Sequence, residues 1–208
     1  MPRPRKFDEG QALDRAMQIF WTLGYDGASM SELTKAMAMN APSVYFAFGS
    51  KRGLFDAVLK RYEERRAPHR NMILAASTAR EAAERMLFGA IEWLTDPAEP
   101  PGCLLLQSGL ASGFASQDVC DELARRRNGV TELLTKLFKQ GQKSGNLVGT
   151  ADPEGLARYC QTVFSGLCVE AAAGKSQADL QSCAKLALAG LNELWAEPSS
   201  MRPVITPS

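Results

Sequence analysis

The chain has 208 residues, of which 45% are hydrophobic and 23% charged, a composition typical of a folded protein with one or two domains. Its formal net charge of +1 argues against a uniformly basic protein that coats nucleic acid. Residues 1–66 carry 11 Lys and Arg against 8 Asp and Glu, a net charge of +3, which leaves −2 for residues 67–208. Any nucleic-acid contact is therefore expected in the N-terminal part.

Several classes of protein are disfavoured by what the sequence lacks. The basic start is not followed by an apolar stretch, and no run approaches the roughly 18 apolar residues that a membrane span needs, so we expect neither a signal peptide nor a membrane partner. The five cysteines have no CxxC spacing, which favours free thiols in a reducing cytoplasm. Because His69 is the only histidine, we expect no catalytic residues, metal site or cofactor.

Apolar residues recur at helical spacing within five stretches, at residues 13–21, 83–94, 130–138, 156–167 and 180–195. No convincing period-two alternation occurs, so the sequence predicts an all-α protein. Three prolines between Asp96 and Gly102 predict a loop between helices. The helices are expected to form an N-terminal three-helix helix-turn-helix domain and a C-terminal antiparallel helical domain.

The polar segment 65–71, which contains Pro68, is the best place for a domain boundary, although one helix could run close to it. We therefore predict a DNA-binding domain at 1–66, with a basic arm at 2–6, and a ligand-binding and dimerisation domain at 67–197. The Pro- and Ser-rich tail at 198–208 is expected to be disordered.

Two very short helices are predicted between Gly24 and Ser50. The first begins with a capping box from Ser29 to Glu32, and the second begins with Asn40 as N-cap and Pro42 in its first turn. Two short helices joined by a three- to four-residue turn are typical of a helix-turn-helix, whose second helix can enter the major groove of DNA. An ordinary helical hairpin has the same spacing, so the pattern alone leaves both interpretations open.

Three stretches in this segment occur in a specific order: FWTLGYDGASM at 20–30, LTKAM at 33–37 and NAPSVYFAFGSK at 40–51. They resemble the DNA-binding domain of TetR/AcrR-type transcriptional regulators, over about residues 6–64. Looser similarity to one branch of that family follows at 101–107, 124–127 and 156–159. The resemblance implies a homodimeric repressor that binds a palindromic operator in double-stranded DNA and responds to an unidentified inducer.

By this resemblance, the hydroxyl of Tyr45 is expected to donate to a phosphate, and Lys51 to contact a phosphate at the start of the next helix. Tyr45 could instead be a core aromatic residue, and Lys51 a solvated charge. Ser43 and Ala47 are expected to face the groove. The predicted DNA-binding residues are Arg3, Arg5, Lys6, Ser29, Asn40, Ala41, Pro42, Ser43, Tyr45, Phe46 and Lys51.

The chain departs from the family pattern at Ala38, where relatives usually have glycine, and at Ala41, where a basic residue is common. The recognition helix, residues 41–48, contains no Arg, Lys, Asn or Gln, so it lacks side chains for bidentate contacts to bases. Base discrimination is therefore expected from thymine methyl groups, Ser43, Asn40, DNA shape or the basic arm. That arm suits a narrow minor groove, although it could also be a solvated terminus.

Two amphipathic stretches, at 153–172 and 177–196, are expected to pack against a second copy as a four-helix bundle, or only to close the monomer core. An inducer pocket needs apolar walls with a few polar groups. The candidates, each of which could equally be simple core, are Phe88, Trp93, Gln107, Phe114, Tyr159 and Phe164.

Cys103 follows two prolines and a glycine at the expected start of a helix, where the helix dipole can stabilise a thiolate. Some members of the resembling family sense oxidants or electrophiles in this way, so a redox role for Cys103 is an alternative. Cys160 and Cys183 lie on apolar stripes and are expected to be core thiols. Two alternative interpretations belong to classes other than a DNA-binding regulator: a small helical enzyme that uses His69 as a base, and a protein-interaction module.

Overall fold

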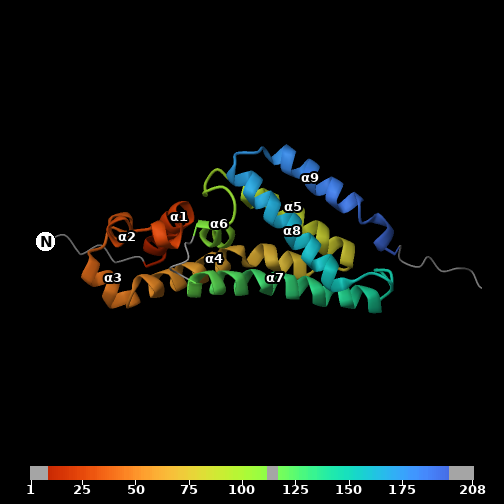
Figure 1. Cartoon of the computed structure of the whole chain (residues 1–208), viewed down its shortest axis with the longest axis horizontal. Helices are drawn as coiled ribbons and strands as arrows, with labels where there is room; N and C mark the ends of the chain where they lie inside the picture. Colours follow the sequence, from red (N-terminus) through yellow and green to blue (C-terminus); the bar gives the residue numbers. More distant parts are fainter. Residues whose placement is uncertain (1–8, 112–116, 197–208) are drawn as a thin grey trace, which may run out of the picture. The chain divides into compact units, whose positions relative to one another are not determined.

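The computed structural model describes residues 9–111 and 117–196. In this part of the chain the secondary structure is helical, apart from an isolated bridge between Leu147 and Trp195, which confirms the all-α prediction (Figure 1). The elements are α1 (Glu9–Gly27), α2 (Met30–Met37), α3 (Ala41–Phe48), α4 (Lys51–Leu74), α5 (Ala79–Leu94), α6 (Leu104–Ala111), α7 (Gln117–Lys143), α8 (Pro153–Ala172), α9 (Gln177–Ala189) and a 3₁₀ turn at Asn192–Leu194.

The chain divides into two compact units, each made of two segments. The N-terminal unit combines residues 1–67 with 96–127, and the C-terminal unit combines 68–95 with 128–208. Three parts of the chain thus pack with the short N-terminal helices: the loop that follows α5, the helix α6, and the start of α7. The helix α4 continues through Pro68, so the polar segment around this proline does not interrupt it. The tail at 198–208 lies outside the described residues.

The core of the N-terminal unit forms where α1 packs against α2 and α6. Phe20 of α1 meets Phe55 of α4, with ring centroids 4.8 Å apart, and both side chains are fully buried. The buried hydroxyl of Ser108 donates to the backbone carbonyl of Phe20 at 3.2 Å, which fixes α6 against α1. At Gly24, φ is +71°, a backbone conformation that favours glycine, so the regular helix is interrupted there.

In the C-terminal unit, α5, α8 and α9 pack side by side (Figure 1). Side-chain caps at Thr78, Asp152 and Ser176 begin the three helices. The stretch 153–172 is helical as expected, but α9 ends at Ala189 instead of continuing to residue 196. Gly190 follows, and the chain then forms the 3₁₀ turn, because glycine weakens a continuing helix.

Candidate DNA-binding interface

The helix α2 begins with the capping box that the sequence predicts. The backbone N–H of Glu32 donates to the hydroxyl of Ser29 at 3.1 Å, and the backbone N–H of Ser29 donates to the Glu32 carboxylate at 2.9 Å. Hydrogen bonds from Ser29 hold the pKa of Glu32 below its usual value. Leu33 and Met37 are buried, so α2 is held to the unit by its apolar face.

The turn between α2 and α3 contains the left-handed residue Ala38, at φ +54° and ψ +40°. Its backbone N–H donates to the carbonyl of Lys35 at 3.2 Å and closes α2. A left-handed conformation brings Cβ close to the following carbonyl oxygen, so an alanine here carries strain that a glycine would not. The turn therefore forms with alanine, at a cost in stability.

The helix α3 is fixed by local caps and by one buried side chain. The Asn40 carboxamide oxygen accepts from the backbone N–H of Ser43 at 2.8 Å, and Pro42 occupies the first turn, where its missing N–H costs nothing. Val44 is buried against the unit. At the end of α3, Gly49 has φ +75° and its N–H donates to the carbonyl of Tyr45 at 2.8 Å.

The other face of α3 is exposed, uncharged and mostly apolar. Tyr45 is 48% exposed and Phe46 is 95% exposed. The remaining exposed residues of the helix are Ala41, Pro42, Ser43 and Ala47. Tyr45 is thus not a core residue. A large aromatic ring that is almost fully exposed buries nothing within the chain, so its contribution is expected in contact with another molecule.

Lys51, the first residue of α4, is half-buried instead of fully solvated. Its ammonium group lies 4.6 Å from the centroid of the Tyr25 ring, a cation–π contact. Burial lowers the pKa of Lys51, and the charge of Asp26 opposes this shift. The sequence did not single out Tyr25 as a partner of Lys51, because 26 positions separate the two residues and no local pattern links them.

The structure brings Asn40, Ser43, Tyr45 and Phe46 together on α3 and its cap. Ser29 and Asn40 are both exposed, but their side-chain oxygens already accept hydrogen bonds from the backbone. Arg3, Arg5 and Lys6 lie outside the described residues. The neighbouring Arg52 is paired with Asp56 at 3.0 Å and also with Asp118.

The candidate inducer residues do not all meet. In the C-terminal unit, the rings of Trp93 and Phe164 have centroids 6.0 Å apart, and Phe88 is half-buried. Tyr159 is 41% exposed, and its hydroxyl donates to the carbonyl of Ala187 at 3.2 Å. Gln107 belongs instead to the N-terminal unit, where its amide donates to the carbonyl of Pro101 at 3.0 Å. Phe114 lies outside the described residues.

Cys103 immediately precedes α6 and is 4% exposed. The hydroxyl of Tyr62 donates to its sulfur at 3.3 Å, so the thiol is packed in the N-terminal unit. A sensing role for Cys103 stays a prediction. Of the two cysteines expected in the core, Cys160 is buried, whereas Cys183 is exposed, because α9 buries only its Leu180, Ala184 and Leu188 face.

Two features of the described residues, 9–111 and 117–196, bear on the class of protein. No group of three or more potential metal ligands comes together there. None of the described helices combines the length and the apolar character needed to span a bilayer.

Comparison with known proteins gives a consistent result. Two family models match the chain: bacterial regulatory proteins of the tetR family over residues 12–58, and the tetracyclin repressor-like C-terminal domain over residues 80–186. The HTH-type transcriptional repressor ComR of Escherichia coli (strain K12) is 32% identical over 197 residues, which are 94% of this chain and 92% of ComR. The HTH-type transcriptional repressor BdcR of the same strain is 28% identical and covers 90% of both chains.

A solved structure resembles the whole fold. It is a cysteine variant of the TetR family transcriptional regulator CifR, complexed with 26-base-pair double-stranded operator DNA. The two chains are 36% identical and superpose with a TM-score of 0.85, covering 90% of this chain and 98% of the CifR chain.

Proposed function

Because the chain belongs to the TetR family of bacterial transcriptional regulators, we propose that it is a homodimeric repressor whose α3 helices bind a palindromic operator in double-stranded DNA. Family membership confirms the expectation of a regulator that is not an enzyme. The observation that carries the proposal is the exposed, uncharged face of α3, a helix that is anchored through Val44 and is followed by Lys51 at the start of α4. CifR, the similar regulator of known structure, was solved with operator DNA.

The composition of α3 defines how it would read DNA. Without guanidinium or carboxamide groups inside the helix, the bidentate recognition of guanine or adenine is excluded there. The exposed ring of Phe46 suits apolar contact with the methyl group of thymine, and Ser43 can exchange a hydrogen bond with a base edge. The exposed hydroxyl of Tyr45 suits a backbone phosphate, which positions the helix without reading sequence.

Cationic groups supply the remaining affinity in this proposal. Lys51 is near the end of α3, where its ammonium can contact a phosphate if it leaves the Tyr25 ring. Arg3, Arg5 and Lys6 of the arm at 2–6 would enter the adjacent minor groove, the role that we proposed for them from sequence. Such binding weakens steeply as salt concentration rises, because each neutralised phosphate releases counterions.

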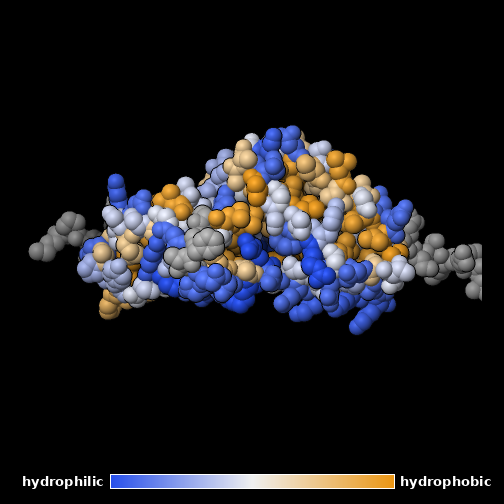
Figure 2. Space-filling model, viewed as in Figure 1, coloured by the Kyte–Doolittle hydropathy of each residue, from blue (hydrophilic) through white to orange (hydrophobic). Residues whose placement is uncertain are grey.

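Dimerisation is proposed through α8 and α9. Their large exposed hydrophobic residues are Tyr159, Val169 and Leu186, the last of these 73% exposed. Figure 2 shows apolar residues on the surface over these two helices. Two copies packed through this face would form a four-helix bundle. The bundle would present two copies of α3 about 34 Å apart, the spacing of successive major-groove faces.

Regulation by an inducer would follow from linkage. The dimer can adopt a conformation whose two α3 helices match the spacing of the major groove and one whose helices do not. A small molecule that binds the second conformation more tightly lowers the affinity for DNA, at most by the ratio of its affinities for the two conformations. A repressor must reach chromosomal DNA, so we propose that the protein is located in the bacterial cytoplasm.

The proposal is tested by selecting bound fragments from genomic DNA and by measuring their affinity by fluorescence anisotropy at several salt concentrations. We expect fragments that share a palindrome, with an affinity that falls as salt rises. For a substitution on α3 such as Phe46→Ala, Leu110→Ala is the matched control, because it removes a side chain that is also apolar and exposed (70%) but lies on α6. Failure to retain any double-stranded fragment at low salt would contradict the proposal.

The dimer is tested separately by analytical ultracentrifugation. Leu186→Glu places a charge on the proposed interface at a position that is exposed in the single chain. We expect the wild-type protein to sediment as a dimer and this variant as a folded monomer. A wild-type protein that stays monomeric at micromolar concentration would contradict the dimer.

A further inference from the structure

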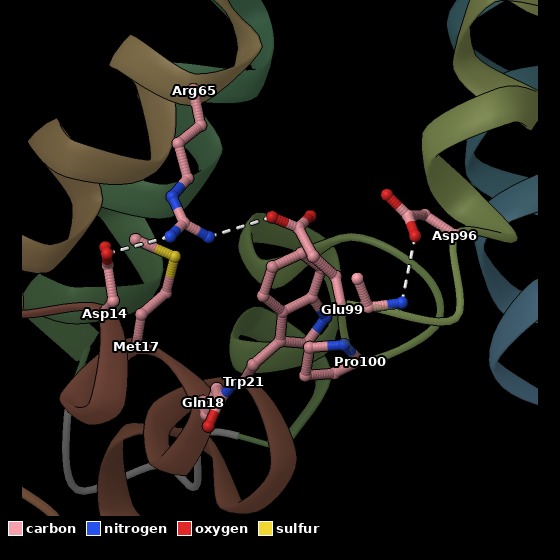
Figure 3. Close-up of a pocket in the computed structure, with 9 residues that line it drawn as sticks. Asp14, Met17, Gln18, Trp21, Arg65, Asp96, Glu99 and Pro100 are labelled. Atoms are coloured by element: carbon pink, nitrogen blue, oxygen red, sulfur yellow. Dashed lines mark hydrogen bonds and ion pairs between the residues drawn. The ribbon is translucent and has the colours of Figure 1, made fainter. Parts of the chain in front are cut away.

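A pocket of about 290 Å³ lies inside the N-terminal unit (Figure 3), and its lining contains no residue of α3. It is bounded by α1, by α4 and by the loop between α5 and α6. Its lining includes Met17, Gln18, Trp21, Arg65, Asp96 and Pro100. None of these residues belongs to the set that the sequence suggested for an inducer.

One wall of the pocket is an ion-pair network that is already satisfied. Arg65 bridges Asp14 at 2.9 Å and Glu99 at 2.8 Å, as Figure 3 shows. Asp14 also accepts from Arg61 at 2.9 Å, and Glu99 is paired with Arg66. These groups hold α1, α4 and the loop together, so they act as a rigid wall and not as the ligand-binding groups.

The indole of Trp21 supplies a hydrogen-bond donor that is not satisfied. Trp21 lines the pocket and is only 3% exposed, yet its indole N–H has no hydrogen-bond acceptor among the described residues. Figure 3 places the indole between Arg65 and Pro100. Buried donors in folded proteins almost always have a partner, so an orphaned N–H in a pocket wall indicates a site for an acceptor atom.

Polar groups at the rim complement this donor. Gln18 and Asp96 line the pocket and are exposed. One carboxylate oxygen of Asp96 accepts from the backbone N–H of Ala98 at 2.9 Å, which leaves the second oxygen for a donor on a ligand. Asp14 and Glu99 are neutralised by the arginines of the ion-pair network, so Asp96 is the carboxylate at the rim that has no cationic partner among the described residues, and it disfavours an anion beside it.

We propose that this pocket binds a small, uncharged, planar molecule in which a carbonyl oxygen lies beside an N–H group, as in a primary carboxamide or a lactam. The carbonyl oxygen accepts from the indole N–H of Trp21, which moves slightly to meet it, and the N–H group donates to Asp96. The apolar part of the molecule packs against Met17 and Pro100. This binding does not depend on DNA, so it stands apart from the proposed repressor function.

The test uses the full-length protein and benzamide as the probe, with binding measured by saturation-transfer NMR and calorimetry. Toluene has the ring without the polar group, and benzoate replaces the carboxamide by an anion. We expect saturable binding of benzamide, about tenfold weaker binding of toluene, as for the loss of one or two hydrogen bonds, and no binding of benzoate. Absence of benzamide binding, or equal affinity for toluene, would overturn the proposal.

Two variants locate the site. Trp21→Phe removes the donor and keeps an aromatic ring, and we expect it to weaken benzamide binding about tenfold. Ala98→Trp fills the rim from an exposed loop position, so it blocks the pocket even if Trp21→Phe unfolds. Trp195→Phe, outside the pocket, is the matched control and should bind normally. Benzamide binding that survives both pocket variants would place the site elsewhere and overturn the inference.

Discussion

Val44 and Phe46 are two residues apart on α3, and their side chains have opposite exposures, 1% for Val44 and 95% for Phe46. Two positions along a helix correspond to a rotation of about 200°, which places the two side chains on opposite faces. Val44 therefore holds the helix in the unit, and Phe46 contributes almost nothing to folding. The two residues separate the structural and the recognition tasks of one short helix.

The first prediction concerns this separation. Phe46→Ala should weaken binding to the selected DNA by about 1–2 kcal/mol, because it removes an apolar contact to a base, and should change the free energy of unfolding by less than about 0.5 kcal/mol. Replacing single thymines of the operator by uracil, which lacks the methyl group, should weaken wild-type binding at particular positions. The Phe46→Ala variant should be insensitive to uracil at those positions. Anisotropy titrations and thermal melts measure both effects.

The strained turn gives a second prediction. Ala38→Gly should stabilise the protein by about 0.5–1 kcal/mol, because relief of the left-handed strain exceeds the added entropy of the unfolded chain. Ala47→Gly, on the exposed face of α3, is the control and should destabilise by roughly the same amount. Urea denaturation measures both. A loss of stability in Ala38→Gly would show that the turn carries no net strain.

The third prediction is a pH dependence at Asp14. The hydrogen bond from Arg61 is the largest cause that lowers the pKa of Asp14 below its ordinary value of 3.8, and it outweighs the opposing effect of burial. Because the folded-state pKa is the lower one, this stabilisation is complete above the unfolded pKa and is lost as pH falls through the folded value.

Asp14→Asn should therefore destabilise the protein at pH 7, by less than about 1 kcal/mol because the pair is partly solvated, and the difference should shrink below about pH 4. Urea denaturation at pH 7, 5 and 3 measures the trend. Glu92→Gln, at an exposed position on α5, is the control. A difference between wild type and Asp14→Asn that persists unchanged at pH 3 would exclude the ion pair as its cause.

The fourth prediction concerns thiol reactivity. Burial raises the pKa of Cys160 to about 12, so at pH 8 this residue is a buried thiol and not a thiolate. We expect iodoacetamide to leave Cys160 unmodified in the folded protein and to alkylate it only in denaturant. Cys120, which is half-buried on α7, should react earlier and serves as the internal reference. Peptide mass spectrometry at successive times gives the order.

The same experiment decides the sensor hypothesis for Cys103. With 4% exposure and a hydrogen bond from Tyr62, Cys103 should react slowly. Alkylation faster than that of Cys120 would favour a sensing role. Alkylation that requires denaturant would contradict such a role in the folded state.

The local structure around α2 and α3 could be predicted because its determinants lie close together in sequence. Ser29 and Glu32 cap one helix, Asn40 and Ser43 begin the next, and each pair is three residues apart. Apolar spacing likewise predicted the helices of both units, since one buried face repeats every three or four residues. Even the strain at Ala38 was signalled by an alanine at a position where relatives usually have glycine.

The relations that the sequence left undetermined join residues far apart in the chain. The helical spacing of apolar residues suggested that Cys183 is buried. Such spacing does not determine which of these residues a neighbouring helix covers, and Cys183 on α9 is exposed. The contact of Lys51 with Tyr25, the grouping of α6 with α1 and the pocket beside Trp21 depend on how distant segments pack. Amino-acid order thus determined caps, turns and helices, whereas burial, pairing and cavities were decided by tertiary packing, which no pattern of neighbouring residues encodes.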